Sequence, residues 1–319
     1  MKGGRPGTKK ILAPAKLNIR LKVTGLRPDG YHELISIMVP VTLFDHLELE
    51  KNRHAKIVLA CRGLSLSNSK ENLVYKAART FFSKTGIRPG ISIKLVKKIP
   101  VAAGLGGGSS DAALTLKTLN SMWSGPLTTH ELERLAAQLG ADVPFFLHSS
   151  PCLARGIGEV LEPIKNWPGF QYVIVVPRFH ISTLWVYENL KFELTADEYD
   201  SIIQQLETGD PDVINLLEND LESVTASYFP VIRDIKKHLM DTGATGALMS
   251  GSGPSVFGIF KSRDQALSAK NRLISLNLGD VFSVEGIVTS SQSRRLSENG
   301  FVARLSANFD GKGTRPKRP

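Results

Sequence analysis

The sequence has few cysteines, no long apolar run and no apolar segment near its N-terminus, and each shortage excludes a class of protein. Only two cysteines, Cys61 and Cys152, occur among 319 residues, too few for a disulfide framework or a cysteine-based zinc site. The longest apolar runs, such as residues 172–176, fall far short of the roughly 18–20 residues that a membrane span requires. The basic N-terminus lacks the apolar segment of a secretory signal. We therefore expect a cytoplasmic protein with no membrane partner.

The excess of positive charge lies at the two ends of the chain. The formal net charge is +10, but residues 1–27 hold eight basic and no acidic residues, and residues 294–319 hold seven basic and two acidic residues. Residues 28–293 are nearly balanced, with a net charge of −3. Basic ends are most often solvated tails, and less often arms that contact RNA or an anionic surface. Since the body has no extended basic face, no nucleic-acid partner is expected.

The order of predicted elements mixes strands with helices, without an internal repeat or a low-complexity tract. Alternation of apolar and polar residues over 17–24 predicts a half-buried strand. Strands are also predicted at 45–51, 56–60, 91–96, 172–176, 281–287 and on both sides of a glycine loop within 245–260, and helices at 73–82, 109–119, 128–139, 264–276 and over most of 183–241. Asn72 is the expected N-cap of the helix at 73–82, and Thr128 with Glu131 predicts a capping box for the helix at 128–139. Residues 27–30 (RPDG) predict a turn. A cluster of Pro163, Pro168 and Gly169 predicts a first domain over residues 1–165, a second over 166–293, and a basic, flexible tail over 294–319.

A glycine-rich loop carries the strongest functional signal. Four of the five residues from Gly104 to Gly108 are glycines, and Ser109 and Ser110 follow at the start of a predicted helix. Backbone N–H groups of such a loop can converge on a phosphate, and a helix N-terminus favours negative charge. The alternative is a flexible turn that needs several positive φ angles. Neither common nucleotide motif fits, because no lysine follows the glycines and Ser109 replaces the last glycine of the dinucleotide fingerprint.

Five stretches together resemble the GHMP kinase superfamily, and most closely its 4-diphosphocytidyl-2-C-methyl-D-erythritol kinases. The resemblance extends from about residue 11 to about residue 291 and rests on residues 14–18 (PAKLN), 29–34 (DGYHEL), 104–113 (GLGGGSSDAA), 139–146 (LGADVPFF) and 250–254 (SGSGP). It implies a two-domain α+β GHMP kinase fold, with the ATP-binding domain first and the active site between the domains. It also implies phosphoryl transfer from ATP, with Mg²⁺ carried by the nucleotide, to the 2-hydroxyl of a cytidine diphosphate methylerythritol, within the non-mevalonate route to isoprenoid precursors.

The resemblance assigns site residues one by one. Lys16 and Asp142 are the expected catalytic pair: the lysine keeps the aspartate ionised, and the pair can orient and deprotonate a hydroxyl. The expected ATP-binding residues are Asn72, Pro100, Val101, Ala102, Ala103, Gly104, Leu105, Gly106, Gly107, Gly108, Ser109 and Ser110. The expected substrate-binding residues are Asn18, Tyr31, His32, Thr183, Tyr187, Gly251 and Ser252. Because Asn18 stands two residues after Lys16, the two side chains should share one face of a strand. Tyr187 stands where the family often has phenylalanine, and no residue is assigned as a metal ligand.

Three alternatives stay open at this point. Asp142 can be an ordinary turn residue, because the side chain of an aspartate can stabilise a turn by a hydrogen bond to the backbone two residues further along. The chain can be another GHMP kinase, one that acts on homoserine or mevalonate, although Tyr31 and His32 disfavour this. A non-catalytic RNA-binding protein that uses its basic ends is the most distant alternative, since such a module needs no phosphate loop.

Overall fold

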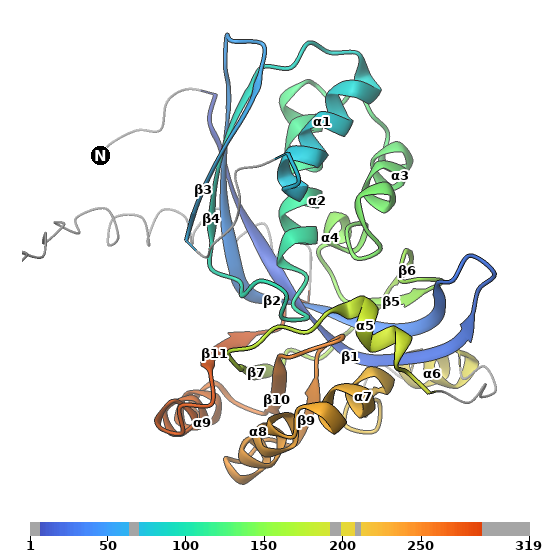
Figure 1. Cartoon of the computed structure of the whole chain (residues 1–319), viewed down its shortest axis with the longest axis vertical. Coiled ribbons are helices and arrows are strands. Elements are labelled where there is room, and N and C mark those ends of the chain that lie inside the picture. Colours follow the sequence, from blue (N-terminus) through green and yellow to red (C-terminus); the bar gives the residue numbers. More distant parts are fainter. Residues whose placement is uncertain (1–6, 64–69, 192–198, 208–211, 289–319) are drawn as a thin grey trace, which may run out of the picture.

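The computed structural model describes residues 7–63, 70–191, 199–207 and 212–288. The tail predicted for residues 294–319 lies outside these residues. Within them, no helix is long and apolar enough to cross a membrane. The described chain forms two β-sheets with helices packed against each (Figure 1).

The first sheet has seven strands and carries the first four helices on one face (Figure 1). Its central order is β3-β4-β2-β1-β8, and β5 and β6 extend from β2. The strands are β1 (Lys9–Leu26), β2 (His32–Lys51), β3 (Ile57–Gly63), β4 (Ile91–Lys97), β5 (Cys152–Arg155), β6 (Val160–Pro163) and β8 (Glu218–Asn219). The helices are α1 (Leu73–Thr85), α2 (Gly107–Met122), α3 (Thr129–Leu139) and α4 (Phe145–His148).

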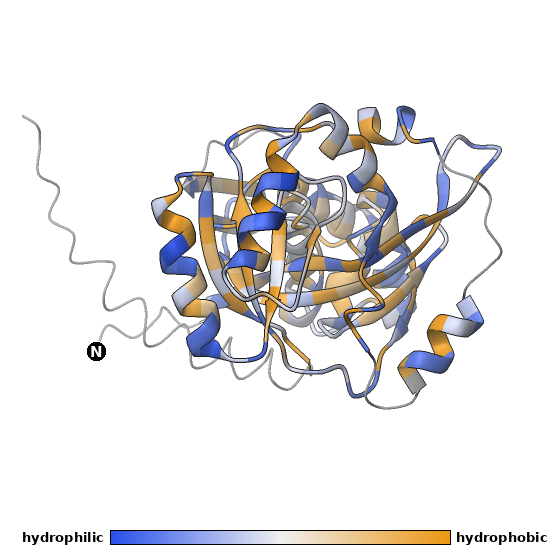
Figure 2. Cartoon of the chain, turned by 90° about the horizontal axis from the view of Figure 1, so that it is seen from below, coloured by the Kyte–Doolittle hydropathy of each residue, from blue (hydrophilic) through white to orange (hydrophobic). Residues whose placement is uncertain are grey.

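The second sheet has four strands in the order β11-β7-β10-β9. The strands are β7 (Gln171–Val176), β9 (Gly246–Met249), β10 (Val256–Phe260) and β11 (Asp280–Glu285), and the remaining helices are α5 (Thr183–Glu188), α6 (Tyr199–Glu207), α7 (Asp220–Tyr228), α8 (Val231–Asp241) and α9 (Arg263–Ser275). The strands are mainly hydrophobic, and the helices around them alternate hydrophilic and hydrophobic residues (Figure 2), as expected of helices that bury one face.

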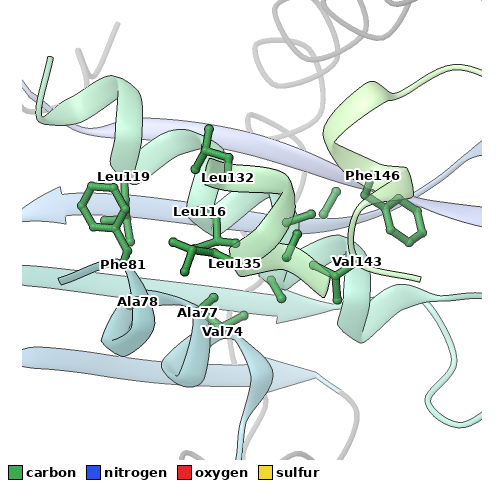
Figure 3. Close-up of a cluster of buried hydrophobic side chains, with 14 of the residues drawn as sticks. Val74, Ala77, Ala78, Phe81, Leu116, Leu119, Leu132, Leu135, Val143 and Phe146 are labelled. Carbon is green, nitrogen blue, oxygen red and sulfur yellow. The ribbon is translucent and has the colours of Figure 1, made fainter. Parts of the chain in front are cut away.

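Helices α1 to α4 form a continuous apolar core with the first sheet. Phe81 of α1, Leu116 of α2 and Phe146 of α4 are fully buried and belong to one cluster (Figure 3). Truncating one such leucine or phenylalanine to alanine costs about 2–5 kcal/mol. This core holds α2, whose N-terminus opens onto the site described below, against the sheet.

Predictions that rest on local signals are confirmed. Asn72 caps α1 by accepting a hydrogen bond from the backbone N–H of Val74, and Thr128 and Glu131 form the expected capping box of α3. The predicted turn after Arg27 is closed by a hydrogen bond of 3.0 Å from the backbone N–H of Gly30 to the carbonyl of Arg27.

Predictions of burial and strand length are less accurate. The strand predicted to be half-buried over 17–24 is buried along residues 17–23, so that prediction is wrong. Its polar side chains have partners inside the protein, as in the ion pairs of Arg20 and Lys22 with Glu218. Residues 32–44 of β2 and the short strands β5, β6 and β8 were not predicted, and β8 interrupts the segment predicted to be mostly helical.

The predicted boundary between residues 165 and 166 falls between β6, in the first sheet, and β7, in the second. The two residues of β8 nevertheless return to pair with β1 in the first sheet. The division into domains at this point remains a proposal.

Candidate active site

A cavity of about 780 Å³ opens beside the glycine loop and is lined by both halves of the chain. Its walls come from β1, β2, the loop between β4 and α2, the turn after α3, helix α5 and the loop after β9. The structure brings to this cavity Lys16, Asn18, Tyr31, His32, Asp142, Thr183, Tyr187, Gly251, Ser252 and every residue from Pro100 to Ser109.

Two predicted ATP-binding residues do not line the cavity. The side-chain oxygen of Asn72 caps α1, and its side-chain nitrogen lies 3.5 Å from the sulfur of Cys61. Ser110 is fully buried, and its hydroxyl has no hydrogen-bond partner among the described residues. Their contact with ATP stays a prediction.

The glycine loop is shaped to present backbone N–H groups. Gly106 has a φ of 67° and immediately precedes α2, which has no side chain capping its N-terminus. The helix starts at Gly107, two residues before the predicted start. The N–H groups of a first helical turn have no partners within the helix, and their partial positive charge favours an anion. The geometry fits a phosphate-binding loop.

Lys16 and Asp142 meet at the cavity wall. Lys16 Nζ lies 3.5 Å from Asp142 Oδ2, and the lysine side chain is only 5% exposed whereas the aspartate is 37% exposed. The backbone N–H of Lys16 donates to the carbonyl of Leu105 at 3.0 Å. Strand β1, which carries the lysine, is thereby joined directly to the glycine loop.

Asn18 orients the lysine through a fixed side-chain amide. Lys16 Nζ donates to Asn18 Oδ1, and Asn18 Nδ2 donates to Ser36 Oγ at 2.9 Å. The Ser36 hydroxyl donates in turn to the carbonyl of Arg20 at 2.6 Å, so its oxygen is left to accept from the amide. The sequence predicted that Lys16 and Asn18 share a face, but it carried no signal for Ser36.

Aromatic side chains gather at the outer part of the cavity. The rings of His32 and Tyr187 stack, with centroids 5.0 Å apart and an angle of 28° between their planes. Tyr31, the preceding residue, is 59% exposed. Burial lowers the pKa of His32, which favours the neutral imidazole with one donor and one acceptor. Nearby, the hydroxyls of Thr183 and Ser252 are 2.8 Å apart.

A buried charged cluster below the glycine loop was not predicted from the sequence. Lys97 Nζ contacts the carboxyl groups of both Asp45 and Asp111, the latter at 2.8 Å. Asp45 also accepts hydrogen bonds from the backbone N–H groups of Lys98 and Ile99. Asp111 Oδ1, in contrast, has no partner among the described residues.

The environment sets the charges of this cluster. Burial raises the pKa of Asp111 well above its ordinary value, and the neighbouring Asp45 raises it further. Burial alone would lower the pKa of Lys97, but the two carboxyl groups raise it. Burial also raises the pKa of Asp45, but Lys97 and the backbone N–H groups of Ile99 and Lys98 lower it. Of the two carboxyl groups, Asp111 is therefore the one that more readily holds a proton, and Asp45 the one that more readily pairs with the charge of Lys97.

Family models and relatives identify the class of protein to which this site belongs. The model of the GHMP kinases N terminal domain matches residues 72–150, and that of the GHMP kinases C terminal domain matches residues 202–277. The chain is 45% identical to a 4-diphosphocytidyl-2-C-methyl-D-erythritol kinase of Syntrophotalea carbinolica. The alignment spans 277 residues and covers 87% of this chain and 98% of the relative. The chain is 44% identical to the enzyme of the same name from Syntrophus aciditrophicus, over 87% of this chain and 99% of the relative.

Solved structures agree with these matches. A crystal structure of a 4-(cytidine 5'-diphospho)-2C-methyl-D-erythritol kinase has a TM-score of 0.73 and 35% identity, and covers 87% of this chain and 99% of that one. A homoserine kinase from Cytophaga hutchinsonii has a TM-score of 0.71 but only 19% identity, over 90% of this chain and 98% of that one, and thus shares the fold. The chain belongs to the 4-diphosphocytidyl-2-C-methyl-D-erythritol kinase family of the GHMP kinases.

Proposed function

We propose that this chain transfers the γ-phosphoryl group of ATP to the 2-hydroxyl of 4-diphosphocytidyl-2-C-methyl-D-erythritol, a step of the non-mevalonate route to isoprenoid precursors. One observation carries the proposal: the Lys16–Asp142 pair, at 3.5 Å, opens onto the same cavity as the glycine loop. The 45% identity to a kinase of that name supports the choice of substrate.

Asp142 is proposed to accept the proton of the substrate hydroxyl. Its carboxylate is the more exposed member of the pair, as required of a group that must reach a bound hydroxyl. Lys16 holds this carboxylate in place and stabilises the charge that develops during transfer. Most of the catalysis comes from positioning the reactants and neutralising charge, as in phosphoryl transfer generally.

ATP is proposed to bind along residues 100–109, with its phosphates against the N-terminus of α2. Asn72 and Ser110, which do not line the cavity, are proposed to support this site indirectly. Mg²⁺ usually binds through one or two protein oxygens together with the phosphates of the nucleotide, where it neutralises phosphate charge. Ser109 is half-buried in the first turn of α2 and lines the cavity, and its hydroxyl oxygen is of the kind that fits this requirement. Ser109 would hold the ion together with the phosphates of the nucleotide.

The cytidine is proposed to bind among Tyr31, His32 and Tyr187, where a base can stack on an aromatic face and reach the neutral imidazole. Asn18, Thr183, Gly251 and Ser252 are proposed to contact the rest of the substrate. A cytoplasmic location is proposed with this function, in agreement with two cysteines that are not joined in a disulfide.

An acceptor comparison tests the proposal. Purified protein is given Mg-ATP with 4-diphosphocytidyl-2-C-methyl-D-erythritol, mevalonate or homoserine, and ADP release is measured by a coupled assay. Phosphorus NMR of the product then locates the new phosphate. We expect turnover only with the cytidine compound and a phosphate monoester at its 2-hydroxyl. Equal or greater turnover with mevalonate or homoserine would contradict the proposal.

A further inference from the structure

Ser250 lies in the loop between β9 and β10, and its hydroxyl bridges two parts of the active site. The residue is fully buried. Its Oγ accepts a hydrogen bond from the backbone N–H of Asn18 at 3.1 Å and donates one to the carbonyl of Gly104 at 3.1 Å. One hydroxyl thus links β1, next to Lys16, to the phosphate loop.

The backbone on both sides of Ser250 is equally close to these segments. A Cβ added at Gly104 would lie 2.1 Å from the carbonyl oxygen of Ser250, and one added at Gly251 would lie 3.2 Å from Asn18 Oδ1 and 3.5 Å from Lys16 Nζ. The first contact excludes a side chain at Gly104, and the others leave little room for one at Gly251. Because the loop belongs to the second sheet, the position of Lys16 relative to the glycine loop depends on both sheets.

The loop itself has rigid supports. The backbone N–H of Ser250 donates to the carbonyl of Ser255 at 2.9 Å, and the N–H of Ser255 donates to the carbonyl of Ala103. Asn219 Nδ2 donates to the carbonyls of Met249 and Gly251, both at 2.8 Å. Ser250 is therefore presented from a fixed frame, and its hydroxyl can determine where its two partners lie.

We propose that Ser250 is a positioning residue for phosphoryl transfer, which sets the distance between the Lys16–Asn18 segment and the phosphate loop. This inference rests on the proposed function and deepens it. Ser250 is fully buried and is not among the residues that line the cavity. Loss of its hydroxyl should move the Lys16–Asp142 pair relative to the phosphate loop that holds ATP. A displacement of about 1 Å can lower the rate about 100-fold.

The same loop offers a matched control in Ser255. It is also fully buried, but its hydroxyl has no hydrogen-bond partner among the described residues, and its contacts to Ser250 and Ala103 use the backbone alone. Ser255→Ala removes the same atom from the same loop without breaking the bridge. We expect Ser250→Ala to lower kcat about 10- to 100-fold with little change in KM for either substrate, and Ser255→Ala to leave kcat within about twofold.

The measurements separate positioning from loss of fold. Steady-state kinetics are run well below the melting temperature of each variant, and hydrogen–deuterium exchange is followed in peptides that span residues 14–20 and 101–108. Faster exchange in both peptides of Ser250→Ala, but not of Ser255→Ala, is expected with the fall in kcat. If Ser250→Ala does not fold, Ser250→Cys, which keeps a weak donor at the same place, replaces it.

Each outcome either supports or contradicts the positioning role of Ser250. If the wild-type protein phosphorylates no acceptor, the proposed function fails before this inference is reached. The positioning role is wrong if the wild-type protein is active and the Ser250→Ala variant, although folded, has the same kcat as Ser255→Ala. Failure of both Ser250 variants to fold, with Ser255→Ala intact, would show a structural role instead and would also overturn the proposal.

Discussion

Adding a single methyl group at Gly106 should disable both the phosphate loop and the catalytic lysine. Gly106 has a φ of +67°, and a Cβ at this position would lie 2.9 Å from Phe146 Cζ and 3.0 Å from Lys16 Cγ. The ring of Phe146 is fully buried in the core beneath α2 (Figure 3) and cannot move aside freely. Lys16, at the edge of the cavity, is the neighbour that must shift.

The magnitude follows from two contributions. An alanine in the left-handed region costs about 1–2 kcal/mol, and overpacking against a buried ring costs about 1–3 kcal/mol. The free energy of unfolding should therefore fall by about 2–5 kcal/mol. Displacement of Lys16 from Asp142 should lower kcat about 100-fold, and distortion of the loop should raise KM for ATP. Gly106→Val should be worse on every measure, because a β-branched side chain fits a positive φ poorly.

Gly108→Ala is the control, because it places the same methyl group two residues away. Gly108 has no positive φ, and an added Cβ would make only an ordinary contact of 3.5 Å with Leu73 Cδ1. Urea denaturation and steady-state kinetics are measured for both variants. We expect Gly108→Ala to keep the wild-type stability within about 1 kcal/mol. The reasoning is refuted if Gly106→Ala equals Gly108→Ala both in free energy of unfolding and in kcat.

Three further predictions concern the catalytic aspartate, the buried cluster and the stacked aromatics. Asp142→Asn should lower kcat about 10²–10⁴-fold with little change in KM, and a folded variant with normal kcat at saturating substrates would make Asp142 a turn residue. Asp111→Asn should cost under about 1 kcal/mol, whereas Asp45→Asn should cost about 3–5 kcal/mol because it leaves the charge of Lys97 unpaired; equal losses in urea denaturation would contradict the charges assigned here. The folded protein raises the pKa of Asp111, so its contribution to stability is present below the unfolded pKa and is lost as pH rises through the folded pKa. Denaturation measured upward from the unfolded pKa of an aspartate, about 4, should accordingly favour Asp111→Asn over the wild type increasingly until the folded pKa is passed, and a constant difference would argue against a raised pKa. Tyr187→Phe should leave KM for the cytidine substrate within about threefold, while Tyr187→Ala should raise it about 5- to 100-fold through lost stacking, and an unchanged KM for the alanine variant would place the base elsewhere.

The sequence was most informative where structure depends on neighbours along the chain. Helix caps such as Asn72 and the capping box of Thr128 act over two or three residues, and the structure confirms both. The glycine loop is another local feature, since successive glycines directly before a helix are typical of phosphate binding. The spacing of Lys16 and Asn18 on one strand likewise predicted that their side chains share a face, and they are in contact.

Sequence reasoning failed where a residue's role depends on a distant partner. Alternating polar residues in β1 indicated contact with water, but their partners lie inside the protein, as with Arg20 and Glu218. Lys97 is separated by 52 residues from Asp45, and no spacing rule predicts that a lysine at the end of one strand meets an aspartate of another. Residue type alone could not distinguish a solvated charge from a buried ion pair.

The sequence by itself therefore determined the chemistry available to this protein: a phosphate loop, a lysine, an aspartate and a pair of aromatic residues. Only the tertiary structure decided which of these groups meet. Asn18 and Ser250 are 232 residues apart, yet they share a hydrogen bond that joins the catalytic strand to the second sheet. Such contacts depend on how the two sheets pack, because a hydrogen-bond partner stabilises a buried polar group and only the assembled fold determines which partner is within reach.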